Sequence, residues 1–203
     1  MSWKASMIII QNPDNLQEDE LILHALDMSE RKYNYTTTLD ECIYPRDQSI
    51  NIGYYNSCVI ICDDFQLTGR FIMDDACNEE EALAKLFPDS EILALSCLNL
   101  TNFHGYCLMK NGKRVRTKAI SSDDGFYVNI GEPIEEEMEL YSQSQLCQGK
   151  RFWAYDNMPN YEFTEDQMLE EFTFGVAKHL LGVYMNESES EKLWSEIPFK
   201  KYF

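Results

Sequence analysis

The chain has 203 residues, 44% of them hydrophobic, and its 35 acidic and 17 basic side chains give a formal net charge of −18. This length suits one domain over residues 1–203, with a core that needs neither disulfides nor a metal. The charge argues against binding to nucleic acid or to an anionic membrane, because both depend on cationic side chains that neutralise phosphate; it fits either a cationic protein partner or simple solubility.

The first half of the sequence predicts strands interspersed with short helices. Its apolar runs end at turn residues such as Asn12-Pro13-Asp14. The run SCVIIC over 57–62 is apolar on both faces, which is typical of a central strand. Residues 29–47 are polar and predict a loop with room for an edge strand. The expected elements are strands over 6–11, 49–54 and 57–62, a helix over 18–28 and a short helix over 65–73.

The second half predicts a β-hairpin and clearer helices. Asn111-Gly112 supplies the positive φ values of a tight turn between strands over 105–109 and 113–120. Thr164 and Gln167 form a capping pattern at the start of an apolar stripe. Further expected elements are helices over 78–87, 133–141, 164–181 and 190–196, and strands over 91–97, 126–130 and 152–155. Since three strands follow one another without a helix between them, the sequence predicts an α+β fold: a mainly antiparallel sheet of about six to eight strands with about four helices packed on it.

The sequence contains none of the common motifs for metal or cofactor binding. Its seven cysteines are odd in number and lie mostly in apolar runs, which indicates reduced, buried thiols. Cys58 and Cys62 share a strand face, but zinc would need two more ligands nearby. No G-x-G-x-x-G, P-loop or HExxH occurs. We therefore expect no metal and no cofactor, and, from the short apolar run at Met7–Ile10, no signal peptide, no membrane span and a cytoplasmic location.

A basic strand is the densest cationic feature of this acidic sequence. Arg114, Arg116 and Lys118 alternate with uncharged residues, so strand periodicity puts all three on one face. Such a face could hold a phosphate or carboxylate ligand. The alternative is a solvated outer face that pairs with the acidic helix over 135–139, and this is what we expect, because exposed faces of antiparallel strands are usually polar.

Two further candidates lie beside that strand. Asp123 and Asp124 precede Gly125, and paired carboxylates can bind a cation or serve as acid and base. Asp and Gly are also what a tight turn requires, and the turn is the favoured interpretation. His104 is the histidine that we would test for activity, with Cys107 or Ser122 as its partner, although no G-x-S-x-G elbow or cysteine-protease signature occurs.

The central segment carries a family resemblance. FHGYCLMKNGKRVRTKAISSDDGFYVNIGEPIEEEMELYSQS resembles an uncharacterised bacterial family of small, soluble, single-domain proteins with a G-Y…NGK…R hairpin, then S-x-D-D-G and G-E-P-L-x-E-E. The likeness extends to EALAKLFP and YEFTEDQMLEEFTFGVAKHLLG, and so covers about residues 80–183. The resemblance implies a stand-alone domain and assigns no activity.

Two functional hypotheses follow. The first is a non-enzymatic protein-interaction domain, of which an immunity-like protein that binds a basic toxin is one form. The second is a hydrolase or small-ligand-binding domain with its site near His104, Asp123 and Asp124, facing the cations of the hairpin. The second hypothesis requires these three residues to converge on one pocket.

Overall fold

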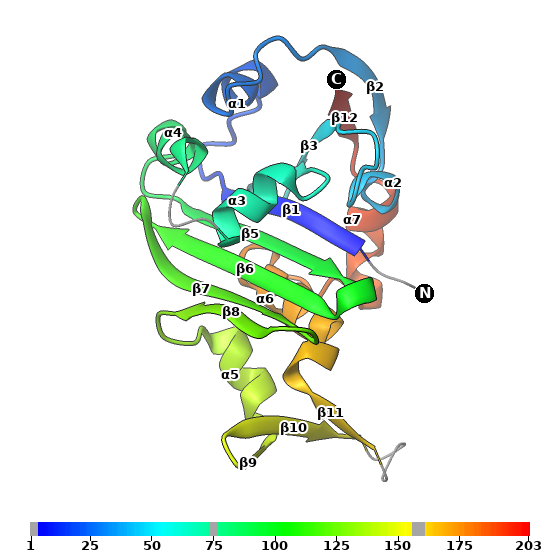
Figure 1. The fold of residues 1–203 in the computed structure, drawn as a ribbon. Coiled ribbons are helices and arrows are strands. Elements are labelled where there is room, and N and C mark those ends of the chain that lie inside the picture. Colours follow the sequence, from blue (N-terminus) through cyan, green and yellow to red (C-terminus); the bar gives the residue numbers. More distant parts are fainter. Residues whose placement is uncertain (1–3, 74–76, 156–160) are drawn as a thin grey trace.

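A large antiparallel sheet dominates the structure. The computed structural model describes residues 4–73, 77–155 and 161–203. Nine strands form one sheet in the order β2-β12-β3-β4-β1-β5-β6-β7-β8 (Figure 1). Their bounds are β1 (Lys4–Gln11), β2 (Tyr33–Thr37), β3 (Ile50–Tyr55), β4 (Cys58–Cys62), β5 (Glu91–Leu98), β6 (Phe103–Lys110), β7 (Lys113–Ser121), β8 (Gly125–Ile130) and β12 (Phe199–Tyr202).

A three-stranded sheet, in the order β11-β10-β9, lies apart from the large one, beyond α5 (Figure 1). It consists of β9 (Gln145–Cys147), β10 (Lys150–Ala154) and β11 (Glu162–Thr164). The α-helices are α1 (Asp19–Ala25), α2 (Leu39–Cys42), α3 (Gln66–Met73), α4 (Asn78–Leu86), α5 (Glu135–Ser142), α6 (Leu169–Leu181) and α7 (Glu191–Ser195). Three short 3-10 helices are η1 (Asn99–Thr101), η2 (Glu165–Gln167) and η3 (Ser188–Ser190).

Both faces of the large sheet are covered by helices. The strand β4 shows why, since all five of its residues are buried and alternate side chains enter two different cores. Val59 and Ile61 pack with α1, α3 and α4, whereas Ile60 packs with α2, α6 and α7. Figure 1 shows α3 crossing one face of the sheet and α6 the other. The prediction that SCVIIC is a central strand is confirmed.

The predicted α+β class is confirmed, but the count of elements is too low. The described residues contain twelve strands in two sheets and seven α-helices, against about six to eight strands and about four helices expected. The elements missed are short, such as β9, β11 and α2. The strand β2 (YNYTT) lies at the edge of the large sheet, within the segment 29–47 where an edge strand was expected. The predicted helix over 164–181 begins as η2, where Gln167 Oε1 accepts the Thr164 N–H at 3.0 Å, and α6 starts only at Leu169.

The turn predictions hold. Asn111 and Gly112 have φ values of 51° and 69° between β6 and β7, as a tight hairpin requires. Residues 122–124 form the turn between β7 and β8, followed by Gly125 at φ 71°. In the described part of the chain, no helix is both long enough and apolar enough to cross a membrane.

Candidate functional site

The three cations of β7 do not share one face. Leu108 pairs with Arg116 and Met109 pairs with Arg114, so Val115 is an extra residue, a β-bulge, between them. The bulge reverses the alternation and sends Arg114 to the α4 side, where its Nε lies 3.1 Å from Glu80 Oε2. The prediction of a common face for Arg114, Arg116 and Lys118 is therefore wrong for Arg114.

Arg116 is buried and fully engaged. Only 2% of its side chain is exposed. Its guanidinium forms a two-point ion pair with Glu137 of α5, at 2.7 and 2.8 Å. It also donates to Asn129 Oδ1 at 2.7 Å and to the carbonyl oxygen of Gly131 at 3.0 Å. The expected solvated outer face is wrong, because α5 covers this face, while the expected pairing with the acidic helix is confirmed.

Lys118 lies deeper still, with a side chain that is not exposed at all. Its ammonium contacts the Glu165 carboxylate and lies 3.1 Å from the Tyr141 hydroxyl and 3.7 Å from the centre of the Phe172 ring. Burial lowers the pKa of Lys118, although the carboxylates of Glu165 and Glu137 oppose that shift. We call Arg116, Lys118, Glu137, Tyr141 and Glu165 the buried ion cluster.

His104 and the two aspartates are not brought together by any contact in the described residues. His104 is 1% exposed and stacks on Phe172 with ring centres 5.1 Å apart. Neither of its ring nitrogens has a hydrogen-bond partner among the described residues. Burial, and then the charge of Lys118, lower its pKa well below the ordinary value, so the ring is neutral. Asp123 and Asp124 are exposed in the turn, where Asp124 accepts a 2.7 Å hydrogen bond from Tyr127.

The suggested partners of His104 are engaged elsewhere. Cys107 packs in the core on the α3 and α4 side of the sheet, whereas His104 lies against Phe172 of α6. Burial raises the pKa of the Cys107 thiol to about 11, so it is protonated at neutral pH. The Ser122 hydroxyl donates to the carbonyl oxygen of Thr101 at 3.0 Å. Neither Cys107 nor Ser122 is therefore poised against His104.

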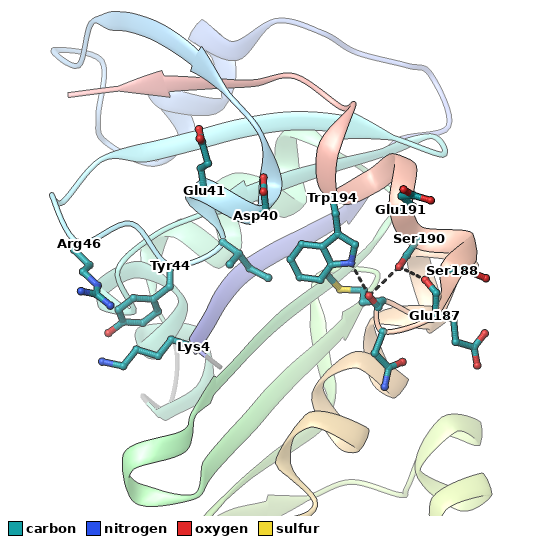
Figure 2. A pocket seen from close by; sticks show the side chains of 13 residues that line it. Lys4, Asp40, Glu41, Tyr44, Arg46, Glu187, Ser188, Ser190, Glu191 and Trp194 are labelled. Carbon is teal, nitrogen blue, oxygen red and sulfur yellow. Dashed lines mark hydrogen bonds between the residues drawn. The ribbon is translucent and has the colours of Figure 1, made fainter. Parts of the chain in front are cut away.

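A surface groove that the sequence did not predict has a volume of about 960 Å³. It lies between the segment around α2 and the segment containing η3 and α7 (Figure 2). Lys4, Tyr44 and Arg46 lie at one end, and Glu187, Ser188 and Glu191 at the other, with Trp194 between them. The groove is lined by Lys4, Asp40, Glu41, Ile43, Tyr44, Arg46, Met185, Asn186, Glu187, Ser188, Ser190, Glu191 and Trp194.

The floor of the groove is fixed by local hydrogen bonds. The Trp194 indole N–H donates to the carbonyl oxygen of Met185 at 2.6 Å, and the Ser190 hydroxyl lies 2.8 Å from the same oxygen. The indole also packs edge-to-face on Phe174, with ring centres 6.2 Å apart. Met185 and Ile43, which belong to the lining, are buried. Trp194 is thus held in place before anything binds.

The charges around the groove are not neutralised by one another. Asp40, Glu41, Glu187 and Glu191 form no ion pair in the part of the chain that the structure describes, and neither do Lys4 and Arg46. The Lys4 ammonium lies 5.4 Å from the centre of the Tyr44 ring. The groove therefore differs from the buried ion cluster, in which every charge has an opposite partner.

Sequence reasoning missed the groove because its two sides are far apart in the chain. Tyr44 and Trp194 are separated by most of the sequence, and no periodic pattern links the polar segment 29–47 with the C-terminal residues. The available signal was an acidic, serine-rich stretch, ESESE, that runs into a tryptophan-containing helix. No three His, Cys, Asp or Glu side chains of the described residues gather in a way that could hold a metal ion.

Fold and site together define an α+β protein with a large antiparallel sheet, a buried ion cluster and a charged surface groove, a class that fixes no chemical activity. Residues 12–199 match the model of a family of unknown function, DUF6928, and the chain belongs to this family. The predicted resemblance to an uncharacterised family is thereby confirmed. Comparison with curated proteins and with solved structures gives no match.

Proposed function

We propose that this protein is a non-enzymatic interaction domain whose partner places a positively charged segment in the groove around Trp194. The observation that carries the proposal is that four carboxylates, those of Asp40, Glu41, Glu187 and Glu191, outnumber the cations Lys4 and Arg46 in one groove. None of these six charges takes part in an ion pair among the residues that the structure describes. Exposed charges of this kind steer a partner of opposite charge into the groove, and they select against partners of their own sign.

Trp194 supplies the apolar contact that charge alone lacks. Tryptophan is among the residues that contribute most to binding at interfaces, and its ring face attracts lysine and arginine side chains. The hydrogen bond to Met185 already satisfies the indole N–H, so a partner need not provide an acceptor for it. A net charge of −18 also accelerates encounter with a cationic partner, in a way that salt weakens.

The hydrolase hypothesis has less support. His104 is buried, neutral and stacked on Phe172, and Asp123 and Asp124 are exposed in a turn. A general base must lie within hydrogen-bond reach of the group that it deprotonates. We therefore favour binding over catalysis, and an immunity-like role against a basic protein is one form that such binding takes.

The test uses a synthetic lysine decapeptide and a glutamate decapeptide as probes in fluorescence anisotropy titrations. We expect the lysine peptide to bind and the glutamate peptide not to bind. The affinity for the lysine peptide should fall as the salt concentration rises. The triple variant Asp40→Asn, Glu187→Gln, Glu191→Gln should weaken binding at least tenfold. Its matched control, Asp14→Asn, Glu30→Gln, Glu132→Gln, removes the same charge at exposed positions outside the groove. Equal losses in both triple variants would refute the groove as the site.

A further inference from the structure

A second cavity, independent of the groove, lies between the large and the small sheet. Its volume is about 680 Å³. It is lined by the end of β7, by β8 and the residues after it, by the β9–β10 hairpin and by residues 164–166. We call it the hairpin pocket. Cavities of a few hundred to about 1,000 Å³ are the size that holds small organic molecules.

The inner wall of the hairpin pocket is the buried ion cluster. Arg116, Tyr141 and Glu165 belong to both. The Tyr141 hydroxyl lies 3.2 Å from Glu137 and 3.0 Å from Glu165, and Arg116 is held from two sides by Glu137 and Asn129. Because these groups satisfy one another, they form a rigid wall and leave the selection of a ligand to the other lining residues.

The outer wall presents two cations, Lys150 and Arg151. The Arg151 guanidinium lies 4.3 Å from the centre of the Tyr141 ring and donates to the Ser144 hydroxyl at 2.9 Å. Neither Lys150 nor Arg151 takes part in an ion pair among the residues that the structure covers. The Asn129 side chain uses its oxygen to accept from Arg116, which leaves its N–H₂ as a donor.

The charge balance of the hairpin pocket is opposite to that of the whole protein. Its lining contains three cations and two carboxylates, those of Glu165 and Asp166, which gives +1, whereas the chain carries −18. Glu165 is neutralised by Lys118, and Asp166 accepts a 2.6 Å hydrogen bond from the Thr164 hydroxyl. The available charges of Lys150 and Arg151 therefore favour an anionic group.

Part of the remaining lining is apolar, beside the hydroxyl groups of Ser121, Ser122 and Thr164. Phe126 is 47% and Leu146 is 67% exposed, although both are large hydrophobic residues, and Ile120 and Pro133 also border the cavity. Exposed apolar side chains beside a cavity gain from contact with an apolar part of a ligand. A bare inorganic anion would leave this wall unused.

We propose that the hairpin pocket binds a small molecule that joins a carboxylate or phosphate group to an apolar body. The acidic group contacts Lys150, Arg151 and the Asn129 amide, and the apolar body lies against Phe126 and Leu146. No covalent step is involved. The role is that of a ligand site, which leaves the groove around Trp194 free for a protein partner.

Six-carbon probes that differ only in their head group test the proposal: hexanoate, hexyl phosphate, hexylamine and 1-hexanol. Each is titrated into the isotope-labelled full chain, and amide NMR shifts of Gly125, Gly131, Gly149 and the Asn129 side chain report binding at the pocket. We expect hexanoate and hexyl phosphate to shift these signals, and hexylamine and hexanol to leave them unchanged at equal concentration. Equal shifts from hexylamine or hexanol would overturn the proposal.

Variants separate the two halves of the site. Lys150→Gln with Arg151→Gln should weaken hexanoate binding at least tenfold, whereas the matched control Lys85→Gln with Lys113→Gln, at exposed positions elsewhere, should change it less than twofold. Lys150→Glu, at an exposed residue, checks the result if the double variant is unstable. Leu146→Ser should weaken hexanoate and leave inorganic phosphate unaffected. If hexanoate binds with unchanged affinity to both the Lys150→Gln, Arg151→Gln double variant and Lys150→Glu, the assignment of the site is wrong.

Discussion

The guanidinium of Arg116 and the carboxylate of Glu137 form a two-point ion pair inside the protein, with Nε–Oε2 at 2.7 Å and Nη2–Oε1 at 2.8 Å. The two side chains are 2% and 0% exposed. The pair joins β7 to α5, and it anchors the wall that the hairpin pocket shares with the core. Removing one partner leaves the other charge buried and unpaired, which costs more than the pair itself contributes.

Glu137→Gln should therefore destabilise the fold strongly. We expect its free energy of unfolding to fall by about 3–5 kcal/mol, because Arg116 keeps its charge in a buried site. Urea denaturation followed by circular dichroism measures the change. Glu135→Gln is the matched control on the same helix, since Glu135 is exposed, and it should change stability by no more than about 0.5 kcal/mol. Similar losses in the two variants would contradict a structural role for the pair.

The same ion pair makes the stability of the fold depend on pH. Burial alone would raise the pKa of Glu137, but the hydrogen bond from Arg116 and the charge of Lys118 hold it below its ordinary value of 4.5. A carboxyl group with a lowered pKa stabilises the fold above its unfolded pKa, and this contribution is lost as the pH falls through the folded pKa. The stability gap between the wild type and Glu137→Gln should therefore narrow from pH 7 to pH 3. A gap that stays constant in urea titrations over this range would contradict the shift.

The sequence was informative where a local rule and the tertiary structure agree. Asn111-Gly112 makes its turn, and CVIIC is central because no polar side chain interrupts it. The burial of Arg116 and Lys118 could not be predicted, since alternating polar residues normally mark the solvated face of a strand. The pairing with the acidic helix was predicted, and Glu137 of α5 provides it, but the sequence of β7 does not show that α5 buries this face or that Glu165 of η2 is a second partner.

The β-bulge at Val115 could not be predicted from the sequence either. Val115 fits the alternation of the strand, and the extra residue is visible only in the pairing of Leu108 with Arg116 and Met109 with Arg114. The groove escaped prediction for a different reason, because Tyr44 and Trp194 meet only after the chain has folded. Neither candidate binding site could have been located from a motif, since both are built from side chains of separate elements.

Cysteine reactivity offers a test of burial across the fold. Cys147 is exposed, whereas Cys58, Cys97 and Cys107 are buried, and burial raises their pKa values to about 11, 12 and 11. Since the thiolate is the reactive form, iodoacetamide at pH 8 should label Cys147 first and leave those three unlabelled in the native protein. Peptide mass spectrometry measures the labelling. Denaturation in guanidinium should make all seven cysteines react; fast native labelling of Cys107 would contradict the structure.

Gly131 connects the bulge with the buried ion cluster. Its φ is +85°, and a Cβ added there would lie 2.0 Å from the Val115 carbonyl oxygen, closer than any real contact. Gly149 has a similar φ of +79°, but a Cβ there would meet nothing within 4 Å. Both Gly→Ala variants pay the cost of a left-handed backbone, about 1–2 kcal/mol, and only Gly131→Ala adds a clash with backbone.

We therefore expect Gly131→Ala to destabilise the protein by at least about 2 kcal/mol more than Gly149→Ala in urea denaturation, since a backbone clash cannot be relieved by a side-chain rotation. Gly131→Ala should also disturb Arg116, because its guanidinium donates a hydrogen bond to the Gly131 carbonyl oxygen at 3.0 Å. Displacing that carbonyl would remove a hydrogen bond from a buried guanidinium, and the Glu137→Gln and Gly131→Ala effects should then be less than additive in the double variant. Equal stability of the two alanine variants would show that the backbone at Val115 can shift to relieve the clash without a loss of stability.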